Sequence, residues 1–263
     1  MESSFPSREF FIRKLTLLSL GFICLLLGSV PSFAEDPAQN ATLTEPNVAL
    51  LKPYTASYKT SARGLTLTLN RELALGADGI YTLTNGGSAL VVGFNEEASF
   101  QVRGNRIIPR FYIYQGTGLM SRRREVQFTE GADTLRSLYK DKWYTLPYTE
   151  NTLDRMSQQE QLRLLLLDDP TPEENTSITV ADKKRVKVYT LVYVGEETLE
   201  TPLGNVDTLH FRRIHDNPDR KSDTWLAPAW DFMMVKTVHI EDGKPIEGMI
   251  NSLSINGHSI TLN

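Results

Sequence analysis

The sequence predicts a mainly β protein, in which a large curved antiparallel sheet or partly open barrel of about twelve strands packs around one α-helix. Three observations support this fold class. Apolar and polar residues alternate through most of the chain after residue 53. Turn sequences rich in Gly, Asn and Asp interrupt the alternation at short intervals. A single long segment lacks both features and is dense in helix-forming residues.

The first clear strand runs from Leu65 to Leu75. Its leucines fall on one face, and its Thr, Asn and Glu residues fall on the other. Asn85-Gly86-Gly87 predicts a hairpin turn between strands at 80–84 and 89–94, because Gly and Asn tolerate positive φ. Gly104-Asn105 predicts the next turn in the same way.

The segment from Thr152 to Leu167 predicts one helix of about four turns. Met156, Glu160 and Leu164 follow helical spacing along one face. Asn151 is placed to cap the first turn. The C-terminal half of the segment is apolar nearly all round, so we expect it to be buried against the sheet.

Strands resume at Val186 and continue almost to the C-terminus. Four turn sequences separate them: Thr201-Pro202-Leu203-Gly204, Asp216-Asn217-Pro218-Asp219, Asp242-Gly243 and Asn256-Gly257. Lys140-Asp141-Lys142 predicts a similar turn earlier in the chain. The strands are short and joined by turns, as in sandwiches and barrels.

Residues 1–34 have the organisation of a secretory signal peptide. A basic stretch at residues 8–14 precedes an apolar run, and Ser32-Phe33-Ala34 fits the small-x-small pattern of a cleavage site. We expect a flexible lead-in over residues 35–53 and a single antiparallel β domain over residues 54–263. The alternative is an uncleaved N-terminal anchor, although the apolar run is shorter than the roughly 20 residues of a comfortable span.

These features predict a periplasmic protein exported by its N-terminal signal peptide. The only cysteine, Cys24, lies in that signal, so the mature chain would have none, as suits an oxidising compartment. No second apolar stretch approaches spanning length, and we expect no transmembrane segment in the mature chain.

Composition and charge exclude several classes of protein. The chain has 263 residues, of which 40% are hydrophobic, so wholesale disorder is excluded. It carries 28 Lys and Arg against 32 Asp and Glu, a formal net charge of -4, which argues against a nucleic-acid partner bound through bulk positive charge. The oligomeric state stays open.

The sequence predicts neither catalytic residues nor a cofactor. It contains no Gly-x-Ser-x-Gly elbow. Its four histidines are His210, His215, His239 and His258. His210 and His215 are separated by an odd number of positions, which places them on opposite faces of a strand, and no pattern brings His215 to His239. We therefore expect no metal site.

Aromatic residues are the candidates for ligand binding. Tyr112, Tyr114, Tyr189 and Tyr193 could line a groove with their hydroxyls as polar anchors, and Trp225 could join them. Core packing is the alternative for all five. The basic run Arg122-Arg123-Arg124 could contact an anionic lipid head group or polysaccharide, or it could be a solvated edge.

Three stretches together resemble a known family. They are a Tyr-x-Ala-x-Tyr strand at Tyr54–Tyr58, the segment ETLETPLGNVDTLHFRR at Glu197–Arg213, and the segment SDTWLAPAWDFMMVK at Ser222–Lys236. With the mid-chain helix, they resemble the bacterial family catalogued as domain of unknown function 3108 over most of residues 53–255. The chain departs from the pattern at Met234, where the family would have Pro.

The resemblance implies an exported, mostly antiparallel β protein of the Gram-negative envelope. It implies no agreed activity and no catalytic residues. Our first expectation is a non-catalytic protein that binds an apolar or amphipathic envelope component, such as a lipid or polysaccharide, or that assists envelope assembly. One alternative is a hydrolase or other enzyme acting on a cell-wall or polysaccharide substrate. Another is a protein-interaction module with no small ligand.

Overall fold

A computed structural model describes residues 51–62, 65–89, 92–118, 121–241 and 243–261. These residues form one sheet of sixteen strands, one α-helix and one short 3₁₀ helix. The first eight strands are β1 (Tyr54–Ala62), β2 (Leu65–Leu75), β3 (Tyr81–Ala89), β4 (Val92–Arg103), β5 (Arg106–Gly118), β6 (Arg122–Gln127), β7 (Thr134–Tyr139) and β8 (Lys142–Pro147). The remaining elements are β9 (Thr152–Leu153), α1 (Ser157–Asp168), β10 (Asn175–Asp182), β11 (Arg185–Thr201), β12 (Gly204–Arg213), β13 (Lys221–Ala227), η1 (Pro228–Trp230), β14 (Met233–Glu241), β15 (Lys244–Ile255) and β16 (His258–Ser259).

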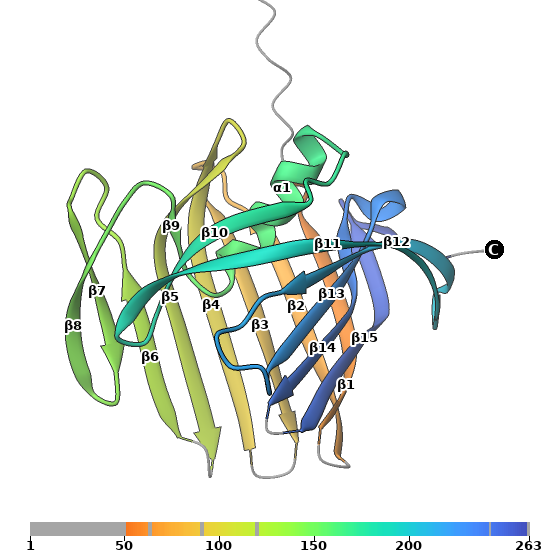
Figure 1. Cartoon of the computed structure of the whole chain (residues 1–263), viewed down its shortest axis with the longest axis horizontal. Helices are drawn as coiled ribbons and strands as arrows, with labels where there is room; N and C mark the ends of the chain where they lie inside the picture. Colours follow the sequence, from red (N-terminus) through yellow and green to blue (C-terminus); the bar gives the residue numbers. More distant parts are fainter. Residues whose placement is uncertain (1–50, 63–64, 90–91, 119–120, 242, 262–263) are drawn as a thin grey trace, which may run out of the picture. The chain divides into compact units, whose positions relative to one another are not determined.

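The sheet consists of two meanders that meet in its middle (Figure 1). Strands β1 to β8 run outward in chain order on one side, and strands β15 to β9 run outward on the other. The seam is the antiparallel pair β1–β15, in which Tyr54 lies opposite Ile255. Every pair is antiparallel except β9–β10, where Leu153 lies beside Val180 in a parallel ladder.

The sheet is strongly curved but open. Among the described residues no ladder joins β8 to β9, the two ends of the strand path. The two arms nevertheless approach one another, because the hydroxyl of Ser137 on β7 donates to the carbonyl of Lys183 in the turn between β10 and β11. The prediction of a large curved antiparallel sheet or partly open barrel around one helix is therefore confirmed.

The number of strands is higher than the predicted twelve or so. The strands that the sequence did not indicate are β9, β10 and β16. Two of them have only two residues each, too few for an alternating pattern. Strand β10 begins with the polar run Asn175-Thr176-Ser177, so alternation is visible only in its second half.

The prediction of a turn at Asn85-Gly86-Gly87 is wrong. These residues lie inside β3 and pair with β4, with Gly87 opposite Phe94. A Cβ atom on Gly87 would come within 2.6 Å of the Leu69 side chain and 2.8 Å of the Thr68 carbonyl oxygen. Glycine is thus needed here for close packing against β2, and the connection to β4 falls at residues 90–91, outside the described residues. The turn predicted at Gly104-Asn105 is correct, and Gly104 has a φ of +61°.

The helix begins later than predicted, at Ser157 instead of Thr152. Thr152 and Leu153 pair with β10 and form β9. Asp154, not Asn151, stabilises the start of the helix, because its carboxylate accepts hydrogen bonds from the backbone N–H groups of Met156 (2.7 Å) and Ser157 (3.0 Å).

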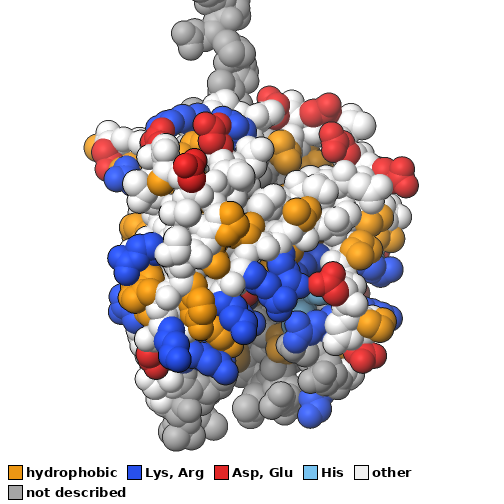
Figure 2. Space-filling view, turned by 60° about the vertical axis from the view of Figure 1, so that its left-hand side comes forward, with side chains coloured by type: hydrophobic (Ala, Val, Ile, Leu, Met, Phe, Trp, Pro, Cys, Tyr) orange, Lys and Arg blue, Asp and Glu red, His pale blue; other side chains and the backbone are white. Residues whose placement is uncertain are grey.

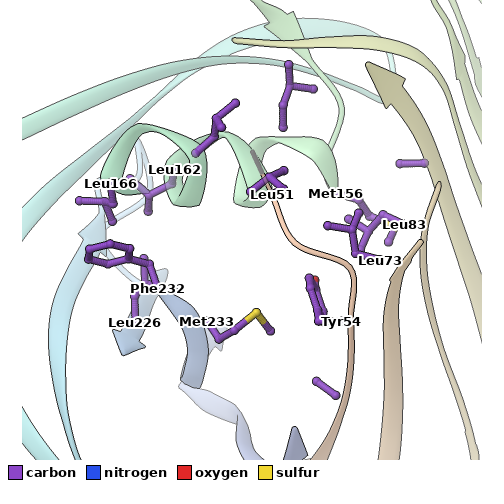
Figure 3. Close-up of a cluster of buried hydrophobic side chains, with 14 of the residues drawn as sticks. Leu51, Tyr54, Leu73, Leu83, Met156, Leu162, Leu166, Leu226, Phe232 and Met233 are labelled. Atoms are coloured by element: carbon purple, nitrogen blue, oxygen red, sulfur yellow. The ribbon is translucent and has the colours of Figure 1, made fainter. Parts of the chain in front are cut away.

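Helix α1 packs against the inner side of the sheet and anchors much of the core (Figure 3). Leu162 and Leu166 lie near Phe232, while Met156 lies near Leu73 and Leu83 of β2 and β3. The C-terminal half of the helix is buried as predicted, but so is much of its polar N-terminal half. The buried polar residues of the helix are Ser157, Glu160, Gln161 and Arg163.

Candidate functional site

A cavity of about 380 Å³ lies inside the curved sheet, against α1. Side chains from α1, β1, β2 and β11 to β15 line it. Figure 3 shows three of its apolar side chains, with Leu162 on the helix and Leu226 and Met233 on the sheet. The lining also includes four arginines, Arg71, Arg155, Arg163 and Arg213, but a single carboxylate, Glu160.

Glu160 is the centre of a buried polar network at the helix. Its side chain is 1% exposed, and its carboxylate accepts hydrogen bonds from the Tyr54 hydroxyl (2.7 Å) and from Arg71 (3.1 Å). The other carboxylate oxygen accepts from Arg163, one helical turn further on. Arg71 also donates through Nε to the Tyr54 hydroxyl at 2.8 Å. The network therefore ties α1 to both β1 and β2.

The two arginines keep Glu160 ionised in spite of its burial. Burial raises the pKa of the Glu160 carboxyl, but Arg163 and Arg71 outweigh this effect and hold the pKa below its ordinary value. A carboxyl with a lowered folded-state pKa stabilises the fold fully above its unfolded-state pKa of about 4.3, and the stabilisation is lost as the pH falls through the folded-state pKa. Burial also raises the pKa of the nearby Tyr58 hydroxyl to about 12, so this group stays protonated.

A second basic pair lies on the wall formed by β11 and β12. The guanidinium of Arg213 lies 3.2 Å from the centre of the Tyr189 ring, and its Nε is buried without a hydrogen-bond partner. Burial lowers the pKa of Arg213, and the positive charge of Arg155 lowers it further. Arg155 precedes α1 and extends an exposed side chain into the cavity. This wall therefore concentrates positive charge.

Two histidines converge on a serine at the same wall. The Oγ of Ser222 lies 2.9 Å from Nε2 of His215 and 2.8 Å from Nδ1 of His239. No sequence pattern indicated that His215 and His239 meet, but the pairing of β13 with β14 places Ser222 opposite His239. Burial, followed by the positive charge of Arg213, lowers the pKa of His215 and favours its neutral form. On the face drawn in Figure 2, Lys and Arg side chains gather beside a His side chain.

The five predicted aromatic residues are not brought together. Tyr189 lines the cavity, and Tyr193 packs at 5.6 Å against Phe211, which lines it too. Tyr112 is buried on β5 and donates to Glu96 at 2.7 Å. Tyr114, also on β5, stacks on Phe94.

Trp225 points away from the cavity. Its neighbours Thr224 and Leu226 both line the cavity, and the alternation of the strand turns Trp225 to the other face. There the indole stacks on His210 at 4.3 Å and donates to Glu197 at 2.6 Å. The ligand-binding roles of Trp225 and of the four tyrosines stay predictions.

The basic run on β6 divides between the two faces. Arg122 and Arg124 lie over the Tyr114 ring at 5.3 and 5.4 Å, whereas Arg123 pairs with the buried Glu125 on the opposite face. Because β6 pairs with β5 and β7, the run is not an edge strand. None of the three arginines lines the cavity.

Sequence reasoning missed most of the charged residues of the cavity. For two of these charged residues, the sequence pattern contains a signal that indicates burial. Arg71 occupies an inward position in the leucine face of β2, and Glu160 stands between Met156 and Leu164 on the apolar face of the helix. A single charge of each sign within an apolar stripe indicates a buried ion pair. No local pattern marks Arg155 or Arg213, because tertiary contacts alone bring them to the cavity.

A second, wider hollow of about 1250 Å³ lies along β2 to β5. It is lined mainly by uncharged Thr, Asn, Ser and Gly residues, with Glu96 and Glu97 as its charged groups. Within the described parts of the chain, no group of three or more His, Cys, Asp or Glu residues is placed to hold a metal ion. No helix among the described residues is long and apolar enough to cross a membrane.

Comparison with known proteins defines a class and then a family. The fold resembles that of a β-barrel-like protein of domain of unknown function 1849 from Brucella abortus, with a TM-score of 0.52 and 12% identity over 78% of this chain and 98% of that one. A candidate lipoprotein from Parabacteroides distasonis matches with a TM-score of 0.31 and 10% identity over 78% of this chain and 96% of that one. No curated protein matches the chain significantly.

The model of the family described as protein of unknown function DUF3108 matches residues 66–244. The chain therefore belongs to this family, as the motifs around Trp225 and Gly204 predicted.

The Glu160 network is expected to be essential for stability. Glu160→Gln removes the charge that neutralises Arg71 and Arg163 and should lower the free energy of unfolding by about 3–5 kcal/mol. Urea denaturation measures the change. Glu150→Gln is the matched control, because Glu150 is 79% exposed in its pair with Arg106 and its loss should cost about 0–1 kcal/mol. Equal costs for the two variants would show that the buried network does not hold the helix.

Trp225 is expected to act through packing. It is 8% exposed, and Trp225→Ala should lower the free energy of unfolding by about 3–5 kcal/mol. The control is Trp143→Ala, since Trp143 is 41% exposed and stacks with Arg136, a contact worth about 1 kcal/mol or less. A Trp225→Ala protein with an unshifted urea midpoint would contradict a packing role and would favour a ligand-binding role for Trp225.

Proposed function

We propose that this protein is a non-catalytic binding protein that holds an apolar or amphipathic component of the cell envelope in the cavity against α1. The observation that carries the proposal is the cavity itself, which lies between the helix and the sheet and is lined by both apolar and charged side chains. Its volume of about 380 Å³ falls within the range of roughly 300–1,000 Å³ typical of small-molecule sites.

The apolar lining suits a flexible chain. Met233 and Met234 stand beside Leu226 and Phe211 in the wall. Methionine side chains are unbranched and adaptable, so they accommodate ligands of variable shape. A flexible hydrocarbon chain placed against such a wall is removed from water, which favours binding by about 0.8 kcal/mol for each buried methylene group.

The proposed location is the periplasm of a Gram-negative bacterium. The n-region, apolar run and Ser32-Phe33-Ala34 site of residues 1–34 support export with cleavage after Ala34. In that compartment a protein with an amphipath-binding cavity would take part in the transport or assembly of envelope components. Protein recovered from the periplasm and beginning at Glu35 is the appropriate material for the experiments below.

A cavity-filling substitution tests the binding proposal. Thr224→Trp places an indole in the cavity wall and should weaken the binding of dansyl-undecanoic acid, followed by fluorescence, by about tenfold or more. Thr145→Trp on the exposed side of β8 is the matched control and should bind like the unaltered protein. Native mass spectrometry of the periplasmic protein should also reveal a co-purified lipid.

Two results would contradict the proposal. One is the absence of any binding by the unaltered protein, which would favour an interaction module with no small ligand. The other is equal binding by the Thr224→Trp and Thr145→Trp proteins, each shown to be folded by circular dichroism. That result would place the fluorescent acid outside the cavity.

A hydrolase is a second candidate, favoured by one specific observation. The Ser222 hydroxyl lies within hydrogen-bond distance of two imidazoles, and a neutral imidazole such as that of His215 can take up the proton of a serine nucleophile. In this case the protein should hydrolyse p-nitrophenyl acetate, and Ser222→Ala should abolish the activity. Ser57→Ala, at a half-buried serine of β1 that does not line the cavity, should retain it. Equal rates for the two variants would exclude Ser222 as a nucleophile.

A further inference from the structure

The charges that line the cavity are unevenly distributed. Arg71 and Arg163 share the carboxylate of Glu160 at the helix. Arg155, in the turn before α1, and Arg213, on β12, form no ion pair with any described residue. Glu96 and Asp182 influence Arg155 only from a distance, and Glu96 is already engaged by the hydroxyl of Tyr112 and the amide of Asn85.

Arg213 interacts with the Tyr189 side chain but has no carboxylate partner among the described residues. Its Nε–H is buried without an acceptor, and an unsatisfied buried donor costs about 1–3 kcal/mol when no partner is supplied. Its position over the Tyr189 ring orients the guanidinium plane but leaves its edge without a carboxylate. An anion beside Arg213 would supply both the missing acceptor and the missing charge.

The sheet places two further hydrogen-bonding groups in the same row. Arg213 on β12 lies directly opposite Ser222 on β13, and Ser222 lies directly opposite His239 on β14. Side chains of directly opposite residues on one face have Cβ atoms about 4.5–5.5 Å apart. A guanidinium, a hydroxyl and an imidazole therefore stand side by side on the inner surface, and all three line the cavity.

We propose that Arg213, Ser222 and His239, together with Arg155, form a subsite for an acidic head group, a phosphate or a carboxylate. This inference rests on the proposed function and defines the ligand more closely, as an anionic amphipath whose acidic end lies against β12 to β14. Its apolar part lies along Phe211, Leu226 and Met233. Arginine suits this role because its planar fork donates two parallel hydrogen bonds to a phosphate or carboxylate.

The experiment compares three probes by isothermal titration calorimetry at concentrations below micelle formation. Dodecyl phosphate carries both the chain and the anion, dodecanol carries the chain alone, and inorganic phosphate carries the anion alone. Dodecyl phosphate should bind about tenfold or more tightly than dodecanol, because charge-assisted hydrogen bonds add to the burial of the chain. Inorganic phosphate should bind more weakly than either.

Substitution of Arg213 then tests the subsite itself. Arg213→Gln should reduce the preference for dodecyl phosphate over dodecanol to about twofold or less and leave the affinity for dodecanol unchanged. Arg155→Gln should reduce the preference partly. Arg122→Gln is the matched control, because Arg122 also stacks with a tyrosine but does not line the cavity, and it should retain the full preference. Arg213→Lys keeps the positive charge and should retain part of the preference for dodecyl phosphate. This partial retention shows that the loss of preference in Arg213→Gln comes from the lost charge and not from misfolding.

The outcomes separate this inference from the proposed function. Equal affinities of the unaltered protein for dodecanol and dodecyl phosphate would overturn the acidic subsite and leave the binding cavity intact. A preference that survives in Arg213→Gln would also overturn it. Binding of inorganic phosphate as tightly as dodecyl phosphate, with no binding of dodecanol, would support the anion site but overturn the amphipath as its source.

Discussion

The carboxylate of Glu160 sets the position of α1, and the helix in turn bounds the cavity. An ionised group that is 1% exposed must be neutralised nearby, and Arg71 from β2 and Arg163 from the helix supply the compensating charge. Tyr54 from β1 completes the arrangement through its hydroxyl. These hydrogen bonds require a defined distance and direction, whereas the leucines around them would tolerate a shifted helix. The polar network therefore fixes the register of the helix on the sheet, and the apolar contacts provide most of the adhesion.

The same network explains why the cavity is basic. One carboxylate lies between two guanidiniums, so the helix side of the lining carries a surplus of positive charge even before Arg155 and Arg213 are considered. The chain as a whole carries a net charge of -4, so this interior surface has the opposite sign. Such an internal field favours acidic ligands. The aromatic rings of Tyr54 and Tyr189 beneath Arg163 and Arg213 keep the guanidinium groups ordered without neutralising them.

The sequence predicted the fold much better than the site. Alternation along Leu65–Leu75 and the turns at Gly104 and Gly204 depend on local physics, and they gave the fold class and most strands. Local rules failed where tertiary contacts decide, as at Gly87, whose lack of a side chain serves packing against Leu69 and not a turn. They failed again at Thr152, which pairs with β10 at the edge of the sheet and is therefore not part of the helix. The row from Arg213 to His239 comes from three strands, and its composition depends on register, which a single sequence does not reveal.

The seam between β1 and β15 has a consequence for the order in which the chain can fold. Ser57 and Ser252, whose hydroxyls meet across this seam, are 195 residues apart in the sequence. Strand β1 therefore cannot pair with β15 until nearly the whole polypeptide has been synthesised. Topologies dominated by such distant pairings fold slowly. A chain of this kind is still unstructured along its seam while its N-terminal part is already synthesised. The seam therefore cannot form until β15, which ends at Ile255, has been synthesised.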